Sequence, residues 1–197
     1  MDYVVQAREK RNNFISTGFP RLDDILGGGF IRGGLYILGA RPAVGKSTFS
    51  LNLADGIAGN LLFVSLEMSP EQILAKRVSR LTGYTASKLL SGQLPDKAWE
   101  AVAMATTSID KSGVYINSRY DLTVQEIHLL AQSVPELRCI ILDYLGLIQP
   151  ATRCGSTYEQ VSAISRELKR MAVSLNVPVV CLCQLSRKIE ERKDKKP

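Results

Sequence analysis

Residues 35–54 read LYILGARPAVGKSTFSLNLA, and this stretch decides the fold of the chain. Its first four residues form an apolar, strand-like run, a tight loop follows, and the residues from Thr48 onward are typical of a helix. A strand that enters a helix through such a loop is the setting of a phosphate-binding P-loop. In that motif, N–H groups of the loop and the positive end of the helix dipole converge on an anion. The loop ends in Gly45-Lys46-Ser47, which fits the motif.

The side chains of this loop suit a nucleotide phosphate and its metal. Lys46 can reach the terminal phosphates, and the Ser47 hydroxyl can ligate Mg²⁺. Ala40 stands where the motif usually has its first glycine, and its small side chain still permits close approach of the backbone. The role of Arg41, which can touch phosphate or a neighbouring chain, stays open. We predict that the phosphate site is formed by Ala40, Arg41, Pro42, Ala43, Val44, Gly45, Lys46, Ser47 and Thr48.

The composition is that of one globular domain. The chain has 197 residues, of which 45% are hydrophobic and 22% charged. Its beginning does not resemble a signal peptide, and no apolar run approaches the ~20 residues of a membrane span, so we expect a cytoplasmic protein. The cysteines are read as free thiols, mostly buried, because their spacing is not C-x-x-C; they are Cys139, Cys154, Cys181 and Cys183.

The net charge of +6 is unevenly placed. Residues 187–197 hold six basic and three acidic side chains, and so carry half of the excess. A basic tail can meet nucleic-acid phosphates, and it can equally be a solvated chain end. At the other end of the chain, residues 1–13 are polar and are predicted to form a linker or arm.

Strand-like and helix-like segments alternate along the rest of the chain. Apolar runs predict strands at residues 35–38, 61–66, 114–116, 139–142 and 177–183. Helices are predicted after the capping signals at Ser69, Thr123 and Thr157, and a further helical stretch after Asp96 should bury Trp99. Because most strands are apolar on both faces, the fold class is α/β, with a mostly parallel sheet and helices on both faces.

Polar residues follow three of these strands, at the sheet edge where such folds bind ligands. Asp143 after four apolar residues is the Walker B pattern, whose carboxylate can hold Mg²⁺ beside Ser47. Glu67 can act as the base or orienter for an attacking water, and Gln184 can hydrogen-bond a γ-phosphate. Glu67 and Gln184 can also be ordinary strand-end polar groups.

The sequence SLEMS at residues 65–69 resembles the signature of DnaB-type replicative helicases, within the RecA-like ATPase superfamily. Four other stretches resemble the same family over the chain from about residue 14 to its end. They are the domain start at Thr17-Gly18-Phe19 with Leu22-Asp23, the Walker A motif at residues 39–47 including Ala40, the Walker B motif at Asp143-Tyr144-Leu145, and the glutamine sensor motif at Gln184-Leu185-Ser186-Arg187.

The resemblance implies a RecA-like P-loop NTPase that works as a hexameric motor. In that family ATP hydrolysis with Mg²⁺ drives translocation on single-stranded DNA, and other replication proteins are partners. Glu67 would be the catalytic glutamate, Lys46 and Ser47 would bind phosphate and Mg²⁺, Asp143 would be the Walker B acid, and Gln184 would sense the γ-phosphate. Residues 1–13 are similar to the linker that docks on a neighbouring subunit.

The sequence also departs from the family pattern. The family continues beyond the equivalent of Pro197 with a DNA-contacting loop, further strands and an arginine finger, and it carries an N-terminal collar domain. We therefore expect residues 14–197 to be a RecA-like core without that C-terminal segment. Such a core should bind Mg-nucleotide, hydrolyse it slowly and not unwind duplex DNA alone.

Two other functions stay open on the sequence. The glycine-rich entries at residues 27–29 and 33–34 would also suit a RadA-type or KaiC-type ATPase. The chain could instead be a non-motor nucleotide-binding module. The loop at residues 149–156, with Arg153, could line a DNA channel or be a solvated loop.

Overall fold

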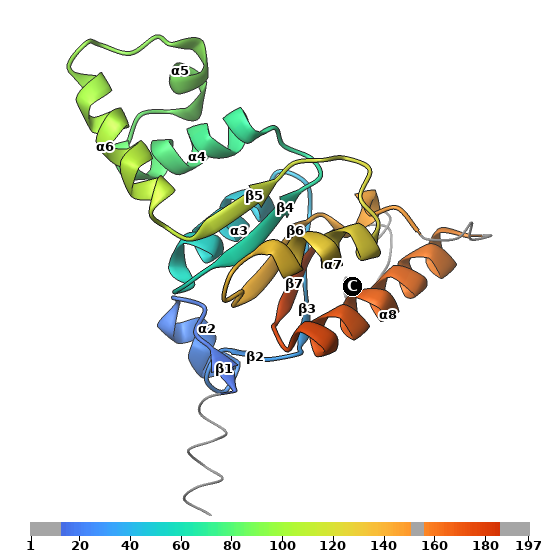
Figure 1. Cartoon of the computed structure of the whole chain (residues 1–197). Helices are drawn as coiled ribbons and strands as arrows, with labels where there is room; N and C mark the ends of the chain where they lie inside the picture. Colours follow the sequence, from blue (N-terminus) through green and yellow to red (C-terminus); the bar gives the residue numbers. More distant parts are fainter. Residues whose placement is uncertain (1–12, 151–155, 186–197) are drawn as a thin grey trace, which may run out of the picture.

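The structure of the chain is a computed structural model that describes residues 13–150 and 156–185 (Figure 1). Its centre is a five-stranded sheet in the order β3-β7-β6-β4-β5. The strands are β3 (Leu35–Ala40), β4 (Leu61–Ser65), β5 (Val114–Asn117), β6 (Cys139–Asp143) and β7 (Val179–Gln184). The larger helices are α3 (Lys46–Gly56), α4 (Pro70–Thr82), α6 (Ala98–Asp110), α7 (Val124–Ser133) and α8 (Thr157–Leu175).

All strand pairings in this sheet are parallel, and both faces are covered, as the apolar runs predicted. On β4, Leu62 and Val64 belong to the core cluster that includes residues of α7 and α8, whereas Leu61 and Phe63 belong to the cluster that includes residues of α3. Figure 1 shows α7 and α8 on one side of the sheet and α3 on the other. The alternation of side chains along a strand therefore supplies two cores, one on each face.

The capping signals place the helix starts. Ser69 and Thr123 each form a complete capping box, with Gln72 and Glu126 as the third helical residues. The predicted cap of α8 at Thr157 is wrong by one residue. Ser156 is the N-cap, because it lies three residues before Glu159 and so completes the same reciprocal pair of hydrogen bonds. At its other end α8 closes on Asn176 in the left-handed conformation, as expected.

Strand β3 runs two residues beyond its predicted end. Gly39 and Ala40 stay in the ladder because β7 lies beside them, with Ala40 opposite Gln184. This pairing brings the start of the P-loop and the end of β7 to the same point of the sheet edge. An apolar run could not reveal it, since Gly39 and Ala40 belong by composition to the loop.

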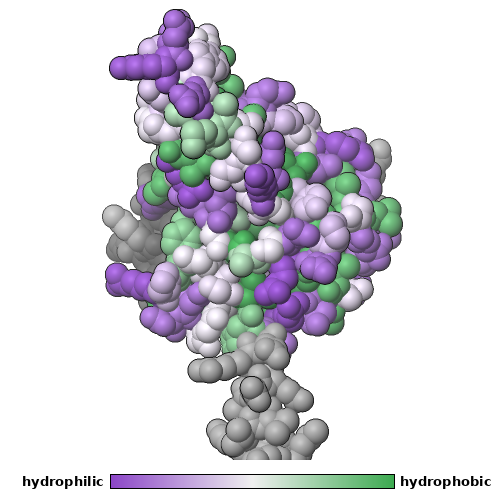
Figure 2. Space-filling view, turned by 60° about the vertical axis from the view of Figure 1, so that its left-hand side comes forward, coloured by the Kyte–Doolittle hydropathy of each residue, from purple (hydrophilic) through white to green (hydrophobic). Residues whose placement is uncertain are grey.

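Helices α4 and α6, with the short helix α5 (Ala86–Ser91), form a lobe at the top of Figure 1. The lobe has a small core of its own, made by Val78, Ala105 and Ile109. Helix α5 was not predicted. The prediction that Trp99 is buried is wrong: it is 47% exposed, because the buried side of α6 carries Ala98, Ala105 and Ile109 and Trp99 lies beside that line. Figure 2 shows apolar and polar side chains interspersed on this lobe.

The segment before the sheet forms an antiparallel pair, β1 (Phe14–Ile15) and β2 (Phe30–Ile31), joined through α2 (Pro20–Ile25). The hydroxyl of Ser16 and the backbone N–H of Thr17 donate hydrogen bonds to the Asp23 carboxylate, at 2.6 and 2.8 Å. Burial acts to raise the pKa of Asp23, but the hydrogen bonds from Ser16 and Thr17 outweigh it and leave the pKa lowered.

Cys139 and Cys181 are buried free thiols, as predicted, and Cys183 is half-buried. Burial raises the pKa of Cys139 to about 12 and also raises that of Cys181. Cys154, the linker at residues 1–12 and the basic tail from residue 186 lie outside the described residues. None of the described helices combines the length and the apolar character that crossing a membrane requires.

Candidate functional site

The predicted phosphate loop lies at the carboxyl edge of the sheet, between β3 and α3. Gly45 is the N-cap of α3 and has φ 98°, a left-handed conformation that glycine adopts without strain. The loop borders a hollow of about 390 Å³, which also receives side chains from the ends of β4 and β7. The hollow is lined by Arg41, Pro42, Ala43, Gly45, Lys46, Ser47, Thr48, Glu67, Lys76 and Gln184.

Seven of the nine predicted phosphate-site residues line this hollow. Ala40 does not, because it is still part of β3. Val44 is exposed and does not line it either. Glu67 and Gln184 do line it, so the structure brings together most of the residues that the sequence nominated.

Lys46 lies at the meeting point of two strand ends. Its Nζ is 3.1 Å from Oδ1 of Asp143 at the end of β6 and 3.8 Å from Oε2 of Glu67 just beyond β4. The same ammonium lies 4.1 Å from the centre of the Tyr144 ring, a cation–π contact. The cation is therefore held by groups from two neighbouring strands, at the start of the helix that follows the loop.

The Asp143 carboxylate is buried, and neither of its oxygens accepts a hydrogen bond from any described residue, although Oδ1 is at ion-pair distance from Lys46. Buried polar atoms without hydrogen bonds are rare, because each costs free energy. Carboxylate and hydroxyl oxygens are the donors that Mg²⁺ prefers, and Ser47 supplies a hydroxyl beside Lys46 in the first turn of α3. Asp143 and Ser47 therefore fit a Mg²⁺ site.

Glu67 is positioned by the turn that follows β4. The Ser65 hydroxyl accepts a hydrogen bond from the Met68 N–H at 3.0 Å and donates one to the Met68 carbonyl at 2.9 Å. Leu66 N–H donates to the Asp143 carbonyl at 2.7 Å, which joins this turn to β6. The turn buries Met68 and leaves the Glu67 side chain 50% exposed at the mouth of the hollow. The geometry gives each residue of the SLEM sequence a separate part in the turn.

Sequence reasoning missed Lys76 of α4. Its side chain lines the hollow, and it forms no ion pair with any described residue. The only signal was a cation nine residues after Glu67 in an amphipathic helix, where a solvated lysine is the ordinary expectation. Arg153, the predicted DNA-contacting residue, lies outside the described residues.

Comparison with known proteins agrees with this geometry. Residues 14–197 match the family described as DnaB-like helicase C terminal domain. The chain belongs to this family. The family match decides against the RadA-type and KaiC-type alternatives that the sequence left open.

Curated DnaB-family relatives align along the whole chain. A protein named replicative DNA helicase DnaC from Bacillus subtilis is 38% identical over 206 aligned positions, which cover 100% of this chain and 45% of the relative. Replicative DNA helicase DnaB from Geobacillus stearothermophilus is 39% identical, covering 98% of this chain and 44% of the relative. The chain therefore spans less than half the length of these relatives.

Two solved structures share the fold. The ATPase domain of a DnaB-like helicase superposes with a TM-score of 0.86 at 30% identity, covering 98% of this chain and 72% of that one. A DnaB-like replicative helicase, described with its interactions with primase, superposes with a TM-score of 0.85 at 30% identity, covering 98% of this chain and 49% of that one. The RecA-like fold predicted from the sequence is confirmed.

Proposed function

We propose that the chain is the ATP-binding and ATP-hydrolysing core of a DnaB-like replicative helicase, working with Mg²⁺. One observation carries this proposal: the Lys46 ammonium lies between the carboxylates of Asp143 and Glu67 at the start of α3. This arrangement puts a cation for phosphate, a buried acid for a metal and an accessible acid for a water at one point of the sheet edge. Phosphoryl transfer needs these groups together.

Each side chain has a role that follows from its place. Loop N–H groups and Lys46 bind the β- and γ-phosphates, while Ser47 and Asp143 hold Mg²⁺, which when bound neutralises charge on the phosphates. Glu67, half exposed at the mouth of the hollow, orients the attacking water and accepts its proton. Gln184 donates its amide to the γ-phosphate, and Lys76 supplies a second cation from the opposite wall.

Nucleotide binding would exchange the partners of Lys46. Without nucleotide, Lys46 pairs with Asp143, and this contact partly offsets the cost of the buried carboxylate. A triphosphate in the hollow attracts the Lys46 ammonium and leaves the Asp143 oxygens for Mg²⁺. The same two residues would therefore neutralise each other in the empty site and serve phosphate and metal separately in the loaded one.

We further propose that this core acts in the cytoplasm, in a hexameric ring that translocates on single-stranded DNA, with primase among its partners. The support is family membership and the printed names of the relatives, which are replicative DNA helicases. A primase interaction is named for one structural neighbour. Arg153 is proposed as a DNA contact in the loop that follows the Walker B strand.

The test is steady-state Mg-ATP turnover against protein concentration, with and without single-stranded DNA, using Lys46→Ala as the blank. We expect turnover per chain to rise with concentration and with DNA. In Lys46→Ala it should fall at least ~100-fold, the usual cost of losing one electrostatic group of a transition state. Turnover that survives in Lys46→Ala would contradict the proposal. Lys46-dependent binding without turnover under every condition would favour the non-motor nucleotide-binding module instead.

A further inference from the structure

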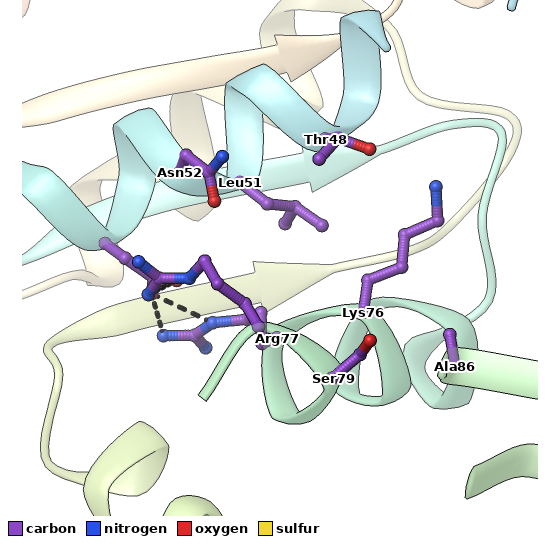
Figure 3. A pocket seen from close by; sticks show the side chains of 9 residues that line it. Thr48, Leu51, Asn52, Lys76, Arg77, Ser79 and Ala86 are labelled. Carbon is purple, nitrogen blue, oxygen red and sulfur yellow. Dashed lines mark hydrogen bonds and ion pairs between the residues drawn. The ribbon is translucent and has the colours of Figure 1, made fainter. Parts of the chain in front are cut away.

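A second hollow, of about 330 Å³, lies between α3 and α4 (Figure 3). Thr48 and Lys76 line both this hollow and the phosphate hollow, so the two adjoin. In Figure 3 the side chain of Lys76 reaches up toward Thr48, whereas Arg77 extends to the other end of the hollow, below Asn52. Two successive residues of α4 therefore bound opposite ends of one space.

Arg77 is a buried cation with a full set of partners. Its side chain is 2% exposed. Its Nε donates to Asp55 Oδ1 at 3.0 Å, and its Nη2 donates to the same oxygen and to the Ser112 hydroxyl at 2.8 Å. Asp55 also accepts a hydrogen bond from Arg80, at 2.6 Å. These contacts tie α4 to the last turn of α3, whose first turn holds Lys46 and Ser47, and to the turn before β5.

An apolar residue would be the ordinary occupant of this position. Arg77 comes four residues after Ile73, which is buried in the core cluster that contains α3 residues, so it continues the inward-facing side of α4. Burying an ion pair seldom stabilises a protein more than a packed apolar side chain does. A fork of hydrogen bonds does fix direction, however, which an apolar contact does not.

We propose that the Asp55–Arg77 pair is a positioning device for Lys76. By fixing the rotation of α4 against α3, it keeps the neighbouring Lys76 ammonium aimed into the phosphate hollow. Adjacent helical residues are about 100° apart around the axis, so locking the direction of Arg77 also sets that of Lys76. This inference rests on the proposed function, since it requires a phosphate ligand in the hollow.

The experiment is a double-mutant cycle on the full 197-residue chain, with the Kd of fluorescent Mg-ADP as the readout. Lys76→Met should raise Kd about tenfold to a hundredfold, the value of a charge-assisted hydrogen bond. Arg77→Met should raise it at least about threefold. In the Lys76→Met background, Arg77→Met should add less than about twofold, because residues that act as one unit are not additive.

Arg80→Met is the matched control, because it removes a 44% exposed partner of the same Asp55 carboxylate while leaving Arg77 locked. It should change Kd less than about twofold. Thermal unfolding checks the fold of each variant, and Arg77→Met should unfold close to wild type because it replaces a buried ion pair by an apolar side chain of similar length. If Arg77→Met does not fold, Asp55→Asn replaces it in the cycle, with the same expected change.

Three results would overturn the positioning role: Kd unchanged in Arg77→Met, additive effects of the two substitutions, or an equal effect of Arg80→Met. Wild-type protein and Lys46→Ala separate this failure from failure of the proposed function. If neither binds Mg-ADP, or both bind it equally, the proposed function itself is wrong. If binding needs Lys46 but ignores Arg77, the positioning role alone is wrong.

Discussion

Asp143 shows how a single residue trades stability for ligand binding. Its carboxylate is buried at the end of β6 and accepts no hydrogen bond from a described residue, which ordinarily costs about 1–3 kcal/mol or more. Lys46 beside it offsets part of that cost. A side chain selected for stability alone at this position would be apolar, like Leu142 before it. The retained carboxylate is the residue-scale sign that the site expects a cation.

Asp143→Asn tests this reading. Asparagine keeps the shape of the side chain but lacks the negative charge that would attract Mg²⁺, so ATP binding should become nearly independent of Mg²⁺. Turnover should fall by about 10²- to 10³-fold. The measurement is the Kd of ATP in Mg²⁺ and in EDTA, together with steady-state turnover. Asp96→Asn, an exposed carboxylate before α6, should leave both unchanged. Equal Mg²⁺ dependence in Asp143→Asn and wild type would refute the assignment.

Helix α3 is fixed at both of its ends. At its start the P-loop turns into it through Gly45, and at its end Gly56 packs against Gly18 of the N-terminal segment. A Cβ on Gly18 would lie 2.4 Å from the Gly56 carbonyl oxygen, and Gly18 has φ +78°. The Thr17-Gly18-Phe19 sequence that resembles the family's domain start therefore has a structural cause: it clamps the far end of the phosphate-binding helix.

Gly18→Ala should be strongly destabilising, by about 2–5 kcal/mol, because backbone strain at positive φ adds to a steric clash with backbone. Gly27→Ala is the matched control. Its φ of +74° is almost the same, yet a Cβ there meets nothing within 4 Å, so it should cost only about 1–2 kcal/mol. Urea unfolding of both variants measures the difference. Equal losses would show that the Gly18–Gly56 contact adds nothing beyond the backbone conformation.

At the scale of elements, sequence reasoning worked wherever the cause was local. The capping boxes at Ser69 and Thr123 and the strand–loop–helix at residues 35–54 depend on residues within one or two turns of each other. It failed where distant parts decide. The extension of β3 through Ala40 needs β7 as a partner, and the approach of Lys76 to the phosphate hollow needs the angle of α4. Trp99 was misplaced because helical periodicity does not reveal which neighbour covers which side.

At the scale of the whole molecule, the net charge of +6 favours association with a polyanion. If the chain binds single-stranded DNA as proposed, the binding constant should fall linearly with salt on logarithmic axes, with a slope near −0.7 per phosphate contact. With about four contacts, the affinity would drop roughly fiftyfold between 50 and 200 mM salt. Fluorescence anisotropy of a labelled oligonucleotide measures this slope. Binding that is independent of salt, or absent at low salt, would remove DNA from the proposal.

The lobe of α4, α5 and α6 has its own small core, and α5 buries no residue completely. Such a unit can open locally, so its amide hydrogens should exchange with solvent before those of the sheet. Since α4 carries Lys76 to the phosphate hollow, a ligand that engages this lysine would slow exchange in α5 and α6, two helices that do not line that hollow. The lobe would then report occupancy of the site from a distance.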